Sequence, residues 1–198
     1  MTTRVDFDTY FLQVADTVAI RADCTRRQVG AVVVDPSTKH ILATGYNGTA
    51  PGQPGCLSGA CPRGRHYKSM NYGSLDYGYH CGGCSTTWKT VPWPCEFAVA
   101  PGSSYDTGPG ACISLHAEQN ATIRAGIRAR GAWIYITDTP CDACMRFMKG
   151  AGYTKITWHG GEWTSGVPES SLKIWTLLLA LDRIVKQSFS RNGRPTRS

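Results

Sequence analysis

The sequence contains no apolar run of the roughly 18–20 residues that a membrane-spanning helix needs. Its longest candidate, residues 172–181, is shorter and contains Lys173. The first residues also lack the basic-then-apolar pattern of a secretory signal. These absences lead us to expect a cytoplasmic protein that makes no membrane contact.

Charged residues are scarce, at 18% of 198 residues, whereas hydrophobic residues make up 41%. These proportions exclude a disordered or fibrous chain and predict one globular domain over residues 1–186. Acidic residues are outnumbered, 14 to 21, which gives a formal net charge of +7. Several of the basic residues lie in a predicted flexible tail over residues 187–198. The excess left on the body suits a small phosphate-bearing substrate as well as it suits nucleic acid.

Cysteine, in contrast, is abundant, with nine residues in the chain. Disulfides are disfavoured in the cytosol, and an odd number of cysteines cannot all be paired. Clustered cysteines in this setting indicate metal or redox chemistry, and zinc is the simplest interpretation.

The spacing of apolar residues predicts helices and strands that alternate along most of the chain. We predict helices over residues 6–22, 115–125, 140–150 and 168–186, and strands over residues 29–34, 41–46, 133–137 and 155–158. This order implies a sheet covered by helices, which is an α/β layered fold. Residues 49–110 show neither the helical spacing of apolar residues nor the alternation typical of a strand. Structureless loops of that length are rare in compact domains. We therefore interpret the segment up to about residue 112 as an insertion that structural zinc holds in place.

Two short segments carry the candidate chemistry. His116 and Glu118 lie at the start of one predicted helix, and Cys141 and Cys144 lie at the start of another, directly after Pro140. The i, i+3 spacing places both sulfurs on one helical face, and a helix N-terminus favours the thiolate that metals require. One nitrogen and two sulfurs leave the fourth tetrahedral position open for water, which is typical of a catalytic zinc site. Glu118 is not needed as a ligand, so its predicted role is to move protons.

The combination H-x-E followed by P-C-x-x-C is the signature of zinc deaminases. On these residues, and on the segments CTRRQVGAVVV (24–34), ATGYNG (43–48), HAEQNA (116–121) and WIYITDTPCDAC (133–144), the chain resembles the cytidine/deoxycytidylate deaminase superfamily, and most of all its dCMP deaminase branch. The resemblance implies a three-layer α/β/α fold with a mixed, roughly five-stranded sheet, and a homo-oligomer, often a hexamer. It also implies that Asn47 contacts the sugar of the substrate, although a turn-forming Asn before Gly is an equal alternative.

Relatives in this branch often carry a second, structural zinc, and the resemblance places Cys24 and Cys56 among its ligands. We predict that the site is completed by Cys61 and Cys112; the alternative is that some of these four are plain buried thiols. A further cluster within the insertion resembles a zinc knuckle and could form a third site or share ligands with the second. Its members are His80, Cys81, Cys84 and Cys95.

Three functions remain open from the sequence. The first is deamination of a free cytosine nucleotide, dCMP or a 5-substituted relative, with Arg26 and Arg27 supplying positive charge for its phosphate. The second is deamination of a base within RNA or single-stranded DNA. The third is a non-catalytic zinc scaffold, which the intact set of His116, Glu118 and the two cysteines disfavours. We rank the nucleotide first.

Overall fold

The computed structural model describes residues 4–61, 63 and 111–166, together with the backbone of three short strands between them. The chain divides into two units, Met1–Trp163 and Thr164–Ser198. Apart from the last residue of the final strand, every described element lies in the first unit. The predicted helix over 168–186 and the predicted tail over 187–198 lie outside the described residues.

A five-stranded sheet forms the centre of the first unit, with the strand order β2-β1-β6-β7-β8. Its members are β1 (Gly30–Val34), β2 (Ile41–Tyr46), β6 (Trp133–Ile136), β7 (Lys155–Trp158) and β8 (Gly161–Thr164). Strand β1 is antiparallel to both β2 and β6, whereas β6 and β7 are parallel. The sheet is therefore mixed, and the expected five-stranded α/β architecture is confirmed.

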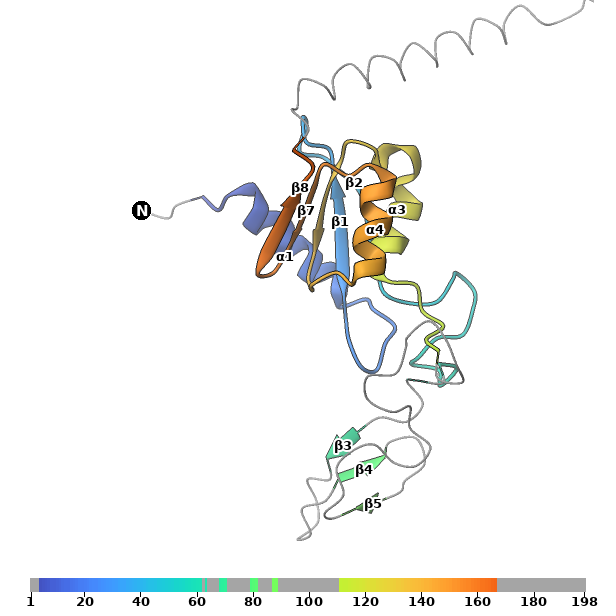
Figure 1. Ribbon diagram of the computed structural model, residues 1–198. Coiled ribbons are helices and arrows are strands. Elements are labelled where there is room, and N and C mark those ends of the chain that lie inside the picture. Colours follow the sequence, from blue (N-terminus) through green and yellow to red (C-terminus); the bar gives the residue numbers. More distant parts are fainter. Residues whose placement is uncertain are drawn as a thin grey trace, which may run out of the picture. The chain divides into compact units, whose positions relative to one another are not determined.

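Helices cover both faces of this sheet (Figure 1). Helix α1 (Phe7–Ala19) lies on one face, and helices α3 (Ala117–Ala125) and α4 (Asp142–Ala151) lie on the other. All five residues of β1 are buried, because each face of this central strand meets a helix. The alternation of side chains along β1 divides the core into two clusters. The three-layer arrangement expected from the resemblance is thus confirmed.

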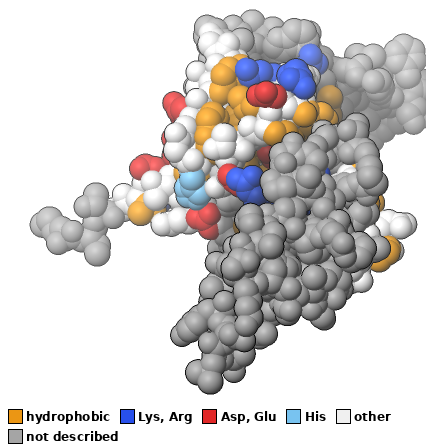
Figure 2. All heavy atoms as spheres, turned by 60° about the horizontal axis from the view of Figure 1, so that its bottom comes forward, with side chains coloured by type: hydrophobic (Ala, Val, Ile, Leu, Met, Phe, Trp, Pro, Cys, Tyr) orange, Lys and Arg blue, Asp and Glu red, His pale blue; other side chains and the backbone are white. Residues whose placement is uncertain are grey.

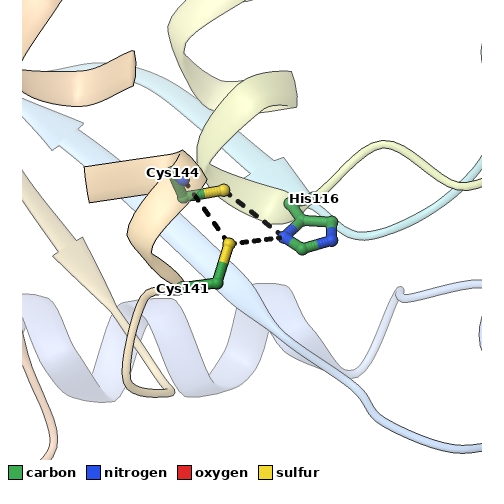
Figure 3. Close-up of side chains that lie close together, drawn as sticks. All are labelled: His116, Cys141 and Cys144. Carbon is green, nitrogen blue, oxygen red and sulfur yellow. Dashed lines mark hydrogen bonds between the residues drawn. The ribbon is translucent and has the colours of Figure 1, made fainter. Parts of the chain in front are cut away.

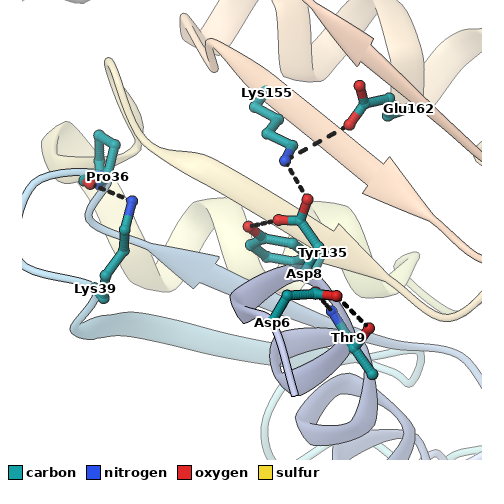
Figure 4. Close-up of polar contacts among 8 residues, drawn as sticks. All are labelled: Asp6, Asp8, Thr9, Pro36, Lys39, Tyr135, Lys155 and Glu162. Carbon is teal, nitrogen blue, oxygen red and sulfur yellow. Dashed lines mark hydrogen bonds and ion pairs between the residues drawn. The ribbon is translucent and has the colours of Figure 1, made fainter. Parts of the chain in front are cut away.

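The cluster under α1 contains Val32 and Val34 with Phe11, Ala15 and Tyr135. An ion pair ties the N-terminal end of α1 to the sheet, because Lys155 Nζ lies 2.6 Å from Asp8 Oδ2 (Figure 4). The Tyr135 hydroxyl donates to the other oxygen of the same carboxylate over 2.7 Å. This polar network satisfies the buried tyrosine and fixes the helix over the strands.

The cluster under α3 and α4 includes Ala31 and Val33 of β1 together with Ala117 and Ala121 of α3. Small residues allow α3 to approach the sheet closely. The closest approach is at Gly45 of β2, where an added Cβ atom would lie 2.3 Å from the Ala121 backbone nitrogen. The position of α3 on the sheet therefore depends on the absence of a side chain at this strand position.

Four strands were not predicted from the sequence. Strand β8 is a four-residue edge strand whose residues are at most half-buried, so it lacks the apolar run by which the other strands were identified. Within the insertion, β3 (Lys68–Met70), β4 (Tyr79–Cys81) and β5 (Thr87–Trp88) pair antiparallel in the order β3-β4-β5. The interpretation of the insertion as irregular was wrong here, because strands of two or three residues are too short to show a period. None of the helices in the described ranges is long and apolar enough to cross a membrane.

Candidate active site

Two helix N-termini bring the predicted metal ligands together. His116 is the N-cap residue of α3, and Cys141 is the N-cap residue of α4. The side chain of Gln119 accepts a hydrogen bond from the His116 backbone N–H over 2.9 Å, which fixes the entry into α3. Asn120 Nδ2 donates to the carbonyl oxygen of Tyr46 over 2.9 Å and so ties α3 to the end of β2.

The three candidate ligand atoms face one another (Figure 3). His116 Nδ1 lies 3.8 Å from Cys141 Sγ and 3.3 Å from Cys144 Sγ. Among the side chains that the structure describes, these residues are the one group of three or more His, Cys, Asp or Glu whose ligand atoms all lie within 4.8 Å of one another. The juxtaposition predicted from the sequence is therefore present.

The spacing fits a tetrahedral zinc ion. Zinc–sulfur bonds of about 2.3 Å and zinc–nitrogen bonds of about 2.0 Å place nitrogen and sulfur ligands ~3.6 Å apart. The two nitrogen–sulfur distances of 3.8 and 3.3 Å bracket this value. A set of one imidazole and two thiols is a typical donor set for zinc, and three protein ligands leave one position open.

The surroundings of the two cysteines also bear on their role as metal ligands. Burial, followed by the negative charge of Glu118, raises the pKa of the Cys144 thiol well above its usual range. A thiolate at this position is therefore stable only beside a positive charge. Cys141 is exposed, and its sulfur accepts a hydrogen bond from the Cys144 backbone N–H over 3.4 Å at the positive end of α4. Both sulfurs are thus arranged to act as thiolate ligands of a metal ion.

Glu118 lies two residues after His116, in the first turn of α3. Glu118 is 4% exposed, and this burial raises the pKa of its carboxyl group above the ordinary value. The Glu118 carboxyl group interacts with the Cys144 side chain, so it lies next to the metal ligands without belonging to their group. A buried carboxyl group whose pKa is raised toward neutrality is suited to accept and return a proton.

A pocket of about 170 Å³ opens beside these residues. Asn47, Arg26 and Arg27 line it together with His116 and Glu118, so the structure places all three predicted substrate-binding residues at the candidate active site. The role of Asn47 stays a prediction. Its side chain accepts a hydrogen bond from the Val29 N–H and donates one to the Arg27 carbonyl oxygen, each over 2.8 Å, as expected for the turn-forming alternative.

The four cysteines predicted to hold structural zinc line the same pocket: Cys24, Cys56, Cys61 and Cys112. Cys61 Sγ lies 4.0 Å from Cys112 Sγ, close to the ~3.8 Å between two sulfurs of a tetrahedral zinc site. Burial first, and then a hydrogen bond with Cys61, raises the pKa of Cys56 to about 12. Among the described side chains, no three of these cysteines have sulfur atoms that all lie within 4.8 Å of one another, as the ligand atoms of His116, Cys141 and Cys144 do. They are neighbours, but they are less compactly arranged than His116, Cys141 and Cys144.

The third predicted cluster cannot be placed in the same way. His80 and Cys81 belong to β4, of which the structure describes the backbone, while Cys84 and Cys95 lie outside the described residues. Two charged residues of the pocket were not foreseen, Arg63 and Asp138. Asp138 directly precedes the Thr-Pro-Cys segment, and this position was a signal that sequence reasoning could have used. Nothing in the sequence separates Arg63 from the neighbouring Arg65.

The chain is similar to known deaminases. The family model for the cytidine and deoxycytidylate deaminase zinc-binding region matches residues 5–159. The deoxycytidylate deaminase of Mycobacterium phage D29 is 32% identical over 156 residues, which are 78% of this chain and 95% of that protein. The deoxycytidylate deaminase of Schizosaccharomyces pombe is 30% identical over 158 residues, and the chain spans 38% of its length.

A solved structure, dCMP deaminase from the cyanophage S-TIM5 in complex with dCMP and dUMP, is 21% identical and has a TM-score of 0.46. The match covers 79% of this chain and 83% of that one. The family model, for its part, spans both helix N-termini that carry the His116, Cys141 and Cys144 group. This chain therefore belongs to the cytidine and deoxycytidylate deaminase family, which binds zinc.

Proposed function

We propose that this protein hydrolyses the exocyclic amine of a free cytosine nucleotide, with dCMP as the substrate and dUMP and ammonia as products. The observation that carries the proposal is the compact group of His116, Cys141 and Cys144 with the buried Glu118 beside it. The names of the two curated relatives, both deoxycytidylate deaminases, support dCMP as the nucleotide.

The residues divide the chemistry between them. His116, Cys141 and Cys144 would hold zinc, which when bound lowers the pKa of a water ligand to about 7 and so supplies a nucleophile at neutral pH. Glu118 accepts the proton that the water gives up. It delivers this proton to the ring nitrogen as the water oxygen bonds to the amine-bearing carbon. It then takes the second proton from the hydroxyl group on that carbon and gives it to the amine as the carbon–nitrogen bond breaks, so that the reaction consumes one water molecule and releases one ammonia molecule.

A base within RNA or single-stranded DNA is the alternative substrate. Proteins that bind a single strand without sequence preference use a positively charged groove that follows the backbone. On the face shown in Figure 2, the described Lys and Arg side chains lie beside Asp and Glu side chains rather than in a continuous basic stripe. This mixture of charges favours a small substrate, as does the pocket volume of about 170 Å³.

A substrate panel tests the proposal. Purified protein is incubated with dCMP, 5-methyl-dCMP, CMP, deoxycytidine and a cytosine-containing oligonucleotide, and ammonia release is measured. We expect the highest kcat/KM for dCMP or its 5-methyl relative. Turnover of the oligonucleotide without turnover of dCMP would show that the ranking of substrates is wrong.

We further propose two or three zinc ions per chain, one in the catalytic group and one among Cys24, Cys56, Cys61 and Cys112. A backbone hydrogen bond to one of these sulfurs supports the second site: the Arg26 N–H donates to Cys24 Sγ over 3.5 Å. Hydrogen bonds of this kind stabilise thiolates that bind metal. The knuckle-like cluster in the insertion stays a prediction for a third site.

The number of zinc ions can be tested by substitution. We expect Cys61→Ser to release one zinc per chain, measured by metal analysis of the purified protein, because a soft thiolate ligand is lost. The control is Leu57→Ser, at a side chain of the same loop that is 71% exposed and contributes no ligand. One zinc per chain in the unaltered protein would exclude the second site.

The predicted homo-oligomer, a hexamer in many relatives, also belongs to the proposal. Ile123 and Ile127 support it, because both are more than half exposed on neighbouring turns of α3 and the 3-10 helix that follows it (Gly126–Ala129). Light scattering in solution measures the mass of the assembly, and a mass equal to that of one chain would contradict the oligomer.

A further inference from the structure

We infer that Asp138 is a positioning residue for substrate recognition, which holds the guanidinium group of Arg27 where it binds the 5′-phosphate of the nucleotide. The inference rests on the proposed function and deepens it, because it names the pair of residues that separates a nucleotide from a nucleoside. Both residues line the pocket that also contains His116 and Glu118. Asp138 was not singled out from the sequence, whereas Arg27 was one of two predicted arginines.

An ion pair joins the two side chains at the wall of the pocket. A terminal guanidinium nitrogen of Arg27, Nη2, lies 2.5 Å from Asp138 Oδ2. The arginine side chain is 66% exposed and the aspartate side chain 30% exposed, so the guanidinium group is the more accessible member of the pair. Ion pairs as exposed as this one add little to the stability of the fold. Its contribution here is the orientation of a donor that a ligand can reach.

The carboxylate of Asp138 is itself held in place. Its second oxygen, Oδ1, accepts a hydrogen bond from the Thr139 N–H over 2.8 Å. The preceding residue is tied to the start of β1, because the Gly30 N–H donates to Thr137 Oγ1 over 3.1 Å and the Thr137 N–H donates to the Gly30 carbonyl oxygen over 3.0 Å. Asp138 therefore belongs to a fixed segment that leads directly to the metal ligand Cys141.

The backbone of Arg27 is held from the other side of the pair. Asn47 Nδ2 donates to the Arg27 carbonyl oxygen over 2.8 Å, and Asn47 Oδ1 accepts from the Val29 N–H over 2.8 Å. Arg27 is thus restrained at both ends, at its backbone by Asn47 and at its guanidinium group by Asp138. A long arginine side chain loses much rotamer freedom when a ligand immobilises it. Restraint before the ligand arrives reduces that loss on binding.

The chemistry of the restrained group fits a phosphate. A guanidinium group has five N–H donors in a planar fork, and two parallel hydrogen bonds from it match two phosphate oxygens. The contact with Asp138 Oδ2 involves one of the three guanidinium nitrogens, which leaves donors for a ligand. Arg26, the other predicted arginine, is also exposed, but among the described residues no acidic side chain forms an ion pair with it. Arg27 is therefore the better oriented of the two.

The same ion pair has a rival interpretation. The negative charge of Asp138 repels a phosphate, so the carboxylate would mask Arg27 rather than present it. The two roles predict opposite results when the carboxylate is removed. Asp138 also acts on Glu118: burial is the main cause that raises the pKa of Glu118, and the negative charge of Asp138 adds to it. That effect is the same for a nucleotide and a nucleoside, so it cancels when the two are compared.

The test measures the ratio of kcat/KM for dCMP to that for deoxycytidine in the zinc-loaded protein. For Arg27→Gln we expect this ratio to fall on the order of 10²-fold, because the paired hydrogen bonds to the phosphate are lost. For Asp138→Asn we expect a fall of about 10-fold, because Arg27 is kept but no longer oriented. The double variant should give the same ratio as Arg27→Gln alone, since Asp138 acts through Arg27. Zinc content should be unchanged in all three.

Two matched controls lie outside the pocket. Asp16→Asn removes the carboxylate of another exposed ion pair, the one with His159, and Arg21→Gln removes another exposed arginine. Both should leave the ratio unchanged. If deoxycytidine turnover is too slow to measure, the inhibition constants of dUMP and deoxyuridine give the same comparison.

Each other outcome overturns the inference. A higher ratio in Asp138→Asn would show that the carboxylate masks Arg27, and an unchanged ratio would show that it does not orient Arg27. A fall in the double variant equal to the product of the two single falls would show that the residues act independently. If Asp138→Asn does not fold, an unchanged ratio in Arg27→Gln still contradicts the inference. Failure of the unaltered protein to deaminate dCMP would instead contradict the proposed function, and that result is seen before any variant is made.

Discussion

Glu118→Gln is expected to lower kcat by about 10²–10⁴-fold and to leave the zinc content unchanged. The amide keeps the size of the carboxyl group but cannot accept the proton of the water or pass it to the substrate. Burial raises the pKa of Glu118, which makes its carboxylate a better proton acceptor, and no other described acid is buried at this site. Steady-state kinetics with dCMP and metal analysis measure the two quantities.

Two further variants serve as controls for Glu118→Gln. Glu162→Gln changes a carboxyl group that is 55% exposed on β8 and should leave kcat unchanged. Cys141→Ser should lower zinc content and activity together, because it removes a metal ligand rather than a proton carrier. If Glu118→Gln retained a rate near that of the unaltered protein, another group would have to carry the proton.

The metal ligands could be predicted because their arrangement is encoded over short stretches. His116 and Glu118 are separated by one residue, and Cys141 and Cys144 by one helical turn, so each helix start fixes half of the site. The helices and strands around them are buried on one or both faces and show clear apolar spacing. Only the contact between the two helix starts depends on the fold of the whole chain. The resemblance to a known family allowed this contact to be predicted.

The walls of the pocket could not be predicted in this way. Arg63 reaches the pocket through the path of an insertion that has no periodicity, and the pairing of Arg27 with Asp138 joins residues more than a hundred positions apart. The same holds for the cysteine cluster. The sequence offers nine cysteines, but only the folded chain places Cys61 beside Cys112. Substrate contacts are therefore encoded less locally than metal ligands are.

Gly45→Ala is expected to lower both stability and activity, although Gly45 does not belong to the pocket. An added Cβ atom would lie 2.3 Å from the Ala121 nitrogen and 2.5 Å from the Ala117 carbonyl oxygen. Both atoms belong to the backbone of α3, so the helix itself must move away from the sheet. Overpacking of this kind typically costs about 1–3 kcal/mol of unfolding free energy. Thermal unfolding of the zinc-loaded protein measures this loss.

The effect on activity follows from where α3 begins. His116 and Glu118 lie at its N-terminal end, on either side of Ala117, whose carbonyl oxygen is one of the two contacts with Gly45. A shift of the helix therefore moves a metal ligand and the proton carrier together. A displacement of about 1 Å can cost on the order of 10²-fold in rate. Gly150→Ala is the matched control: it adds a methyl group on α4 where nothing lies within 4 Å, and it should raise stability by about 0.5–1 kcal/mol. If the two variants had the same kcat and unfolding temperature, close packing of α3 on β2 would not be what positions the active site.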